Sequence, residues 1–326
     1  MAWYNNVIML VLQIILLVVG FALLIKGADI FVDGASSTAQ NFKVPKILIG
    51  LTIVAFGTSA PELAVSIKAL ASGSSDMVLG NVIGSNILNI FLILGLAAVI
   101  RPVVVRRQTV IKEIPFYILL TGLLVNLILD STLNGASDDY FSRADGITTI
   151  MFFIFFVYYL VKTAIRGRAE DVEERPKYKL AKSLLFVGLG LAGIILGSHL
   201  VVESATEIAH TFGVSERIIS LTVIAFGTSL PELVTSVMAA KKGEQELLIG
   251  NIIGSNIFNI AVVLGVPAVM FGGVDVTGFS AIDIFTFAIS AIVLFAFAFQ
   301  KRKISRIEGV MMLAFFVSYY GTVFIE

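Results

Sequence analysis

Long apolar runs alternate with short polar segments along the whole chain. Ten of these runs come close to or exceed the roughly 20 residues that a helix needs to cross a bilayer. They span 7–27, 46–70, 77–100, 113–130, 147–165, 181–209, 216–240, 247–270, 279–299 and 307–325. The pattern therefore predicts an all-α membrane protein with ten transmembrane helices.

The polar segments between the runs differ in charge, and this difference predicts the orientation. With the N-terminus outside, the cytoplasmic loops hold 19 of the 23 basic residues, whereas the opposite loops are acidic or neutral, as in 130–145. Basic residues concentrate in the cytoplasmic loops of membrane proteins. We therefore expect a multi-pass protein of the cell (plasma) membrane with both termini outside.

Composition agrees with the membrane class and narrows the possible partners. Hydrophobic residues make up 57% of the 326 residues and charged residues only 14%, whereas soluble domains have about 25% charged residues. The 23 acidic residues balance the 23 basic ones, which disfavours nucleic acid as a partner. The chain has no cysteine, so a disulfide framework and a thiolate metal site are excluded. The lipid bilayer is the expected surrounding, and no obligatory protein partner is evident.

The chain repeats itself after an offset of 170 residues. Residues 51–63 and 221–233 are identical at 10 of 13 positions, and residues 80–90 and 250–260 are identical at 9 of 11. One offset without gaps predicts that both halves carry the same helices in the same order.

The repeat also predicts how the two halves are oriented. We expect a first five-helix repeat in 1–165, a charged cytoplasmic linker in 166–180 and a second repeat in 181–326. Because five is an odd number, the second repeat must enter the membrane upside down. Inverted repeats are typical of secondary transporters, whose site lies where the repeats meet.

The repeated motif AFGTSxPE places a proline and a glutamate inside a predicted span of each half. Pro61 and Pro231 lack an N–H and clash with the preceding turn, so each helix must break or kink there. The break releases backbone carbonyls, and Glu62 and Glu232 follow directly. A cation can satisfy such oxygens inside a membrane.

Other oxygen-bearing residues recur every four positions, which places them on shared helix faces. They are Thr58, Ser66, Asn81, Ser85 and Asn89, with their repeats Thr228, Ser236, Asn251, Ser255 and Asn259. Carboxylates, hydroxyls, amides and carbonyls together suit a hard cation such as calcium. Gly80, Gly84, Gly250 and Gly254 permit close helix approach. The absence of cysteine and of a histidine cluster argues against zinc or copper.

Several of these polar residues have a structural reading that stays open. Capping or interhelix hydrogen bonds account for Asn81, Asn86, Asn251 and Asn256 at least as well as ion contact does. Ser66 and Ser236 could bond to their own helices. Acidic residues near helix ends are read as a solvated face, and the two histidines as interface residues; they are Asp29, Asp33, Glu203, Glu207, His199 and His210.

The paired motifs GTSAPE with GNVIGSNILN, and GTSLPE with GNIIGSNIFN, resemble the two alpha repeats of the cation/calcium exchanger superfamily. The GTSxPE form is similar to its prokaryotic sodium/calcium exchanger branch, and the resemblance covers essentially the whole chain. It implies ten helices and an antiporter, not an enzyme, that exchanges three sodium ions for one calcium ion by alternating access. It implies no cofactor besides the transported ions.

The resemblance also implies roles for single residues. Glu62, Glu232, Thr58 and Thr228 would form the calcium site. The sodium sites would use the same four residues together with Ala55, Ser59, Ser85, Asn89, Ala225, Ser229, Ser255 and Asn259. Some relatives, including potassium-dependent exchangers, carry Asp at the position of Asn259, so Asn argues here against potassium dependence.

Two alternatives to sodium/calcium exchange remain at this point. Two carboxylates in a membrane can also carry protons, which keeps a proton/calcium antiporter open as the runner-up. An intramembrane hydrolase is disfavoured because the sequence offers no nucleophile with a matching base.

Overall fold

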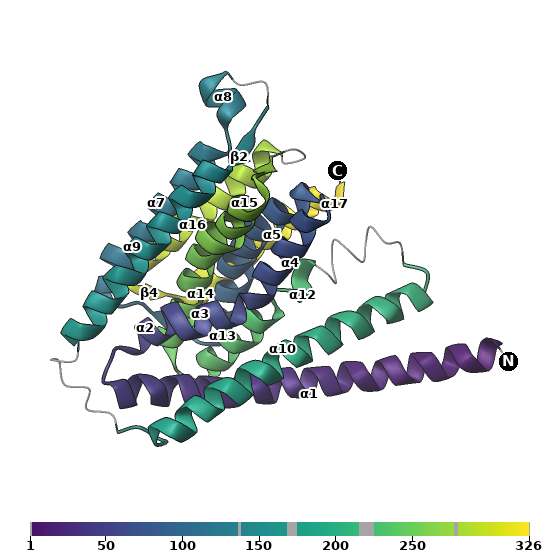
Figure 1. The fold of residues 1–326 in the computed structure, drawn as a ribbon. Coiled ribbons are helices and arrows are strands. Elements are labelled where there is room, and N and C mark those ends of the chain that lie inside the picture. Colours follow the sequence, from purple (N-terminus) through teal and green to yellow (C-terminus); the bar gives the residue numbers. More distant parts are fainter. Residues whose placement is uncertain (1, 136–137, 168–174, 215–224, 277–279, 326) are drawn as a thin grey trace.

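The computed structural model describes residues 2–135, 138–167, 175–214, 225–276 and 280–325 as a mostly helical protein (Figure 1). The elements of the first half are α1(Ala2–Phe42), α2(Lys46–Ile49), η1(Gly50–Val54), α3(Ala55–Thr58), α4(Ala60–Ala71), α5(Ser75–Leu88), η2(Asn89–Leu94), α6(Gly95–Ile100), β1(Val103–Val104), η3(Thr109–Glu113), α7(Ile114–Leu127), α8(Asp130–Asn134), β2(Tyr140–Ser142) and α9(Arg143–Gly167). The elements of the second half are α10(Leu180–Thr211), α12(Ala225–Gly227), α13(Leu230–Lys242), α14(Gln245–Phe258), η5(Asn259–Leu264), α15(Gly265–Phe271), β3(Gly273–Asp275), α16(Ala281–Lys301), β4(Lys303–Ile304) and α17(Arg306–Ile325). The η elements are π-helical turns.

These helices follow the predicted apolar runs closely. Within the described residues, seven helices are long and apolar enough to cross a membrane, or eight if the bent pair 46–58 and 60–71 counts as one span. The predicted span 216–240 lies partly outside the described residues, and α13 covers its second part. The predicted run 307–325 coincides with α17. The total of ten spans therefore stays a prediction.

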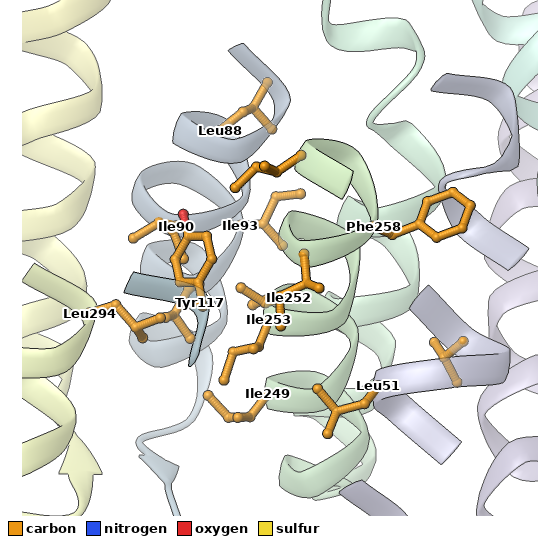
Figure 2. Packing of buried hydrophobic residues seen from close by; sticks show 14 of the residues in the cluster. Leu51, Leu88, Ile90, Ile93, Tyr117, Ile249, Ile252, Ile253, Phe258 and Leu294 are labelled. Carbon is orange, nitrogen blue, oxygen red and sulfur yellow. The ribbon is translucent and has the colours of Figure 1, made fainter. Parts of the chain in front are cut away.

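The centre of the molecule is formed by two continuous helical rods, α5–η2–α6 and α14–η5–α15. In the most apolar stretch of each helix, 72% of the residues are buried in the first rod and 94% in the second, whereas only 11% are buried in α1. A helix that is apolar on all sides is stable when protein surrounds it. Figure 2 shows this packing, with Ile93 of η2 near Ile252 and Ile253 of α14, and Ile90 beside Tyr117.

Proline breaks a helix at the same place in both halves, as predicted. The chain bends by 42° between 46–58 and 60–71. Ser59 has φ −87° and ψ 6°, and Ser229 has φ −88° and ψ 3°, which lies in the sparsely populated bridge region. Pro61 and Pro231 then occupy the first turn of α4 and α13, where a missing N–H costs nothing. Glu62 and Glu232 therefore sit in the first turn of a new helix.

The first helix is longer than predicted, because its apolar face continues well beyond residue 27. α1 runs from Ala2 to Phe42, and Phe31, Ala35 and Ala39 are fully buried. It lies against α10, and the two helices form a slanted layer along one side of the bundle (Figure 1).

Glycines set the distance and the relative direction of this helix pair. A Cβ at Gly27 would lie 2.8 Å from the Ile194 nitrogen, and a Cβ at Gly34 would lie 2.8 Å from the Ser183 carbonyl oxygen. Residue numbers therefore rise along α1 as they fall along α10, so the pair is antiparallel. Gly250 and Gly254 likewise touch η1, as predicted, while a Cβ at Gly84 would meet nothing within 4 Å in the described part.

The fold is mostly helical, as predicted, and the described residues also include two short antiparallel ribbons that the apolar pattern did not predict. Strand β1 pairs with β4, and β2 pairs with β3. Each ribbon joins a strand of the first half to one of the second. The apolar runs predict spans only, so the short extended connections between them left no periodic signal.

Asp29 and Asp33, which the sequence predicts on a solvated face, keep side chains 41% and 22% exposed and also form ion pairs with Lys242. Asp33 also pairs with Lys177 of the linker, and this carboxylate raises the pKa of Lys177. These pairs bind α1 to the C-terminal end of α13. By contrast, Glu203 is exposed and pairs only within its own helix, with His199, among the contacts of the described residues.

Candidate functional site

Two carboxylates lie buried in the centre of the bundle, one on each broken helix. Glu62 and Glu232 are each only 1% exposed, and they are close enough for their charges to repel. Each is contacted by a serine from the helix break of the other half. Ser59 Oγ donates to Glu232 Oε1 at 2.7 Å, and Ser229 Oγ lies 3.5 Å from Glu62 Oε1. The two predicted motifs therefore meet in one site, which neither half could form alone.

Several buried oxygens in this region have no hydrogen-bond partner among the described residues. They include the second oxygen of each carboxylate, Glu62 Oε2 and Glu232 Oε2, and the amide oxygens Asn89 Oδ1 and Asn259 Oδ1. A buried polar oxygen without a partner is costly, and a buried charge without one costs far more. These two pairs of oxygens are related by the 170-residue offset. Their shared deficit is one that a bound cation would remove.

The remaining predicted ligands lie around the carboxylates. Thr58 Oγ1 lies 3.1 Å from both the Val54 carbonyl oxygen and Asn251 Oδ1, and Thr228 occupies the equivalent position in the second half. Ser85 Oγ lies 3.2 Å from Ser229 Oγ, and Ser255 Oγ lies 3.5 Å from both Glu232 Oε1 and the Ala55 carbonyl oxygen. Ala225 is the first residue of α12.

The two asparagines with unpartnered oxygens, Asn89 and Asn259, occupy equivalent positions at the start of a π-helix. Asn89 begins η2 and Asn259 begins η5, and both are buried. Single π-helical turns inside α-helices occur frequently at functional sites. The exact agreement of the two halves supports the predicted placement of both residues in the centre.

Asn81 and Asn251 make interhelix hydrogen bonds, which is one of the two roles expected for these residues. Asn81 Nδ2 donates to Ser66 Oγ at 3.0 Å, and Asn251 Nδ2 donates to Ser236 Oγ at 3.0 Å. Each bond ties the glutamate-bearing helix to the following rod. Asn81 and Asn251 therefore help to hold the glutamate-bearing helices α4 and α13 in place.

A serine that the sequence analysis missed satisfies one of the carbonyls released at the helix breaks. Pro231 cannot donate to the Gly227 carbonyl, which instead accepts from Ser198 Oγ of α10 at 2.9 Å. A cation is thus not needed at this carbonyl. The position equivalent to Ser198 in the first half is Ala28, so the repeat itself offered no signal for this contact.

The arrangement has the properties of a hard-cation site. Two carboxylates carry up to two negative charges, and neutral hydroxyls, amides and carbonyls supply the other oxygens. Among the described residues, no three His, Cys, Asp or Glu side chains gather into a group that could hold a metal ion. An ion held by two carboxylates and weak neutral ligands can leave again, as a transported ion must.

Comparisons with known proteins agree with this geometry. The family model described as "Sodium/calcium exchanger protein" matches residues 12–162 and 182–325. The CaxA protein of Alkalimonas amylolytica is 40% identical over 301 residues, which cover 89% of this chain and 92% of CaxA. The sodium/calcium exchanger MaX1 of Methanosarcina acetivorans is 33% identical, with 89% of this chain and 92% of MaX1 covered.

The fold is also similar to a solved structure. The sodium-calcium exchanger NCX_Mj superimposes with a TM-score of 0.83 at 33% identity, covering 96% of this chain and 99% of that one. Family model, relatives and fold agree over nearly the full length. This chain belongs to the sodium/calcium exchanger family.

Proposed function

We propose that this protein is a secondary antiporter that exchanges sodium for calcium across the membrane by alternating access. The observation that carries the proposal is the set of four buried, unpartnered oxygens on Glu62, Glu232, Asn89 and Asn259. Calcium takes six to eight oxygen ligands and accepts carboxylates, amides and carbonyls. Two carboxylates balance one divalent ion, which limits the cost of two charges inside a membrane.

Ten helices in two inverted repeats are the architecture that we propose around this site. Three kinds of observation support it. The serine–glutamate contacts come in pairs related by one offset. Each ribbon pairs one strand from each half. The first helix of each half, α1 and α10, run antiparallel, as an odd number of spans per repeat requires.

We assign the ions to residues as follows. Calcium would bind Glu62, Glu232, Thr58 and Thr228. Sodium ions would share these residues and use the flanking hydroxyls, amides and carbonyls of Ala55, Ser59, Ser85, Asn89, Ala225, Ser229, Ser255 and Asn259. Because the two ions compete for the same carboxylates, binding of one requires release of the other, which couples their transport.

A ratio of three sodium ions to one calcium ion completes the proposal. Each cycle would then move one net positive charge. Both termini would face the outside, because this places the basic loops, including the linker with Lys177, in the cytoplasm. Asn259 leaves the centre with two carboxylates rather than three.

Calcium uptake into proteoliposomes tests the proposal. Purified protein is reconstituted, and uptake of radioactive calcium is measured with an outward sodium gradient and, separately, with an outward proton gradient. We expect uptake with sodium and none with protons. Uptake driven by protons alone would replace sodium coupling by proton coupling, and no uptake with either gradient would refute calcium antiport.

A further inference from the structure

We propose that Asn86 and Asn256 are positioning residues that hold the amide groups of Asn259 and Asn89 with their oxygens toward the transported ions. Neither residue is among the ion ligands assigned above. The inference rests on the proposed function, since it concerns how that same site is kept selective for cations.

The four asparagines form a crossed network between the two central rods. Asn89 Nδ2 donates to Asn256 Oδ1 at 2.8 Å, and Asn259 Nδ2 donates to Asn86 Oδ1 at 3.2 Å. Each positioning residue therefore acts on the ion-facing residue of the other half. All four side chains are buried, so water does not compete for these bonds.

Two further bonds hold the positioning residues themselves. Asn86 Nδ2 donates to the Asn256 carbonyl oxygen at 3.3 Å, and Asn256 Nδ2 donates to the Asn86 carbonyl oxygen at 3.4 Å. These bonds place the NH₂ group of each side chain against the carbonyl of the other rod, so its oxygen is the end that lies beside Asn89 or Asn259. That oxygen can accept from the NH₂ group of Asn89 or Asn259, but it cannot accept from a carbonyl.

This constraint decides which end of each ion-facing amide points to the ions. An amide has an oxygen that accepts and an NH₂ group that donates, and a half-turn exchanges the two. With the NH₂ groups of Asn89 and Asn259 bound to the positioning residues, their oxygens remain, and both are the buried atoms without a partner. A half-turn of either amide would aim an NH₂ group at a cation. It would also bring the amide oxygen of Asn89 or Asn259 against the oxygen of Asn256 or Asn86, where a hydrogen bond now lies.

We call the Asn256–Asn89 and Asn86–Asn259 pairs the two relays, and one additional contact makes them unequal. Asn256 Nδ2 also lies 3.0 Å from the hydroxyl of Tyr117, which is fully buried within the apolar packing of Figure 2. The position equivalent to Tyr117 in the second half is Phe287, which is also fully buried but has no hydroxyl. Asn256, and through it Asn89, is therefore held more firmly than Asn86 and Asn259.

A crossed double-mutant comparison tests the relay. Equilibrium binding of sodium, the ion assigned to Asn89 and Asn259, is measured on purified protein for Asn256→Ala, Asn89→Ala and Asn259→Ala, and for the two double variants that contain Asn256→Ala. Loss of a group that orients a metal ligand typically lowers metal affinity about 10- to 100-fold. We expect Asn256→Ala to lower sodium affinity in this range in the native background, and to have little further effect in Asn89→Ala. It should keep its full effect in Asn259→Ala, which is the matched control, because that residue depends on Asn86 instead.

The outcomes separate positioning from other roles, because interacting residues are non-additive whereas independent ones add. An equal effect of Asn256→Ala in both backgrounds would mean that Asn256 binds ions directly or acts through general packing, and would overturn the proposal. Unchanged affinity in Asn256→Ala would overturn it as well. A native protein without sodium binding would instead refute the proposed function.

Tyr117→Phe provides a milder variant that should fold, since Phe287 already occupies the equivalent position. We expect a few-fold loss of sodium affinity, abolished in the Asn256→Ala background, with melting in ion-free buffer close to native. Tyr117 would be excluded from the relay if Tyr117→Phe caused the same loss of affinity in the Asn256→Ala background. It would also be excluded if Tyr117→Phe caused no loss in the native background.

Discussion

Replacement of Lys242 by methionine should destabilise the protein by removing the anchor between α1 and α13. Lys242 Nζ lies 2.6 Å from the Asp29 carbonyl oxygen, 2.7 Å from Asp29 Oδ1 and 2.7 Å from Asp33 Oδ1. These three contacts use all three N–H groups of the ammonium. Methionine keeps a long apolar stem, so the change removes the charge and the hydrogen bonds but little of the packing.

The expected loss in the free energy of unfolding depends on how buried Lys242 is and on which partners its two aspartates keep. A hydrogen bond to a charged group contributes about 1.5–3 kcal/mol, but the Lys242 side chain is 21% exposed, so water screens part of this. Asp33 also keeps Lys177 as a partner. We therefore expect a loss of about 2–3 kcal/mol for the three contacts together. At about 2 °C per kcal/mol for a large chain, the melting temperature should fall by about 4–6 °C.

Lys177→Met is the matched control, because Lys177 pairs with the same carboxylate from a position that is 62% exposed. Exposed ion pairs contribute about 0–1 kcal/mol, so melting should change by no more than about 2 °C. Both variants are heated in one detergent without sodium or calcium, since a bound ligand raises apparent stability, and the fraction that stays monodisperse is measured by size-exclusion chromatography. Equal losses in both variants, or a larger loss in Lys177→Met, would refute the reasoning.

Four further outcomes are expected. Glu62→Gln or Glu232→Gln should each abolish calcium exchange in proteoliposomes, because one carboxylate cannot balance a divalent ion away from water; near-normal flux in either variant would contradict the assignment. Asn259→Asp should make transport more sensitive to pH between roughly 5 and 8, because protons compete for the added carboxylate, and an unchanged profile would place residue 259 away from the ions. In sodium-loaded vesicles, an inside-positive potential should speed calcium uptake, since a charge that crosses the field fully gains about 2.3 kcal/mol per 100 mV; uptake that ignores a clamped potential would refute the three-to-one ratio. The folded-state pKa of Lys177 is raised, so its ion pair stabilises the protein below the unfolded pKa of about 10.4 and is lost as pH rises through the folded value. The small melting difference between native protein and Lys177→Met should therefore be constant from pH 6 to 9.

Local features of the sequence were enough to identify the membrane class, the repeat and the central carboxylates. Apolar run length depends on bilayer thickness, and the proline break follows from the chemistry of the proline ring. Pro61 and Pro231 therefore predicted the two breaks, and the offset of 170 predicted that Glu62 and Glu232 are equivalent. The length of α1 was not predicted, because the continuous apolar run ends at residue 27 whereas the helix continues to Phe42. Its second part mixes buried apolar residues with polar ones, and a run of apolar residues does not detect such a helix.

Only the tertiary structure decided which residues of the two halves touch. Ser59 contacts Glu232 rather than the glutamate of its own half, Asn256 lies beside Asn89, and Ser198 reaches the carbonyl beside the second break. Helical spacing relates residues three or four apart on one helix, whereas a hydrogen bond between helices depends on how they are placed in space. The sequence by itself determined which chemical groups enter the membrane and at what spacing; the packing of the two rods determined which oxygens are satisfied and which remain for an ion.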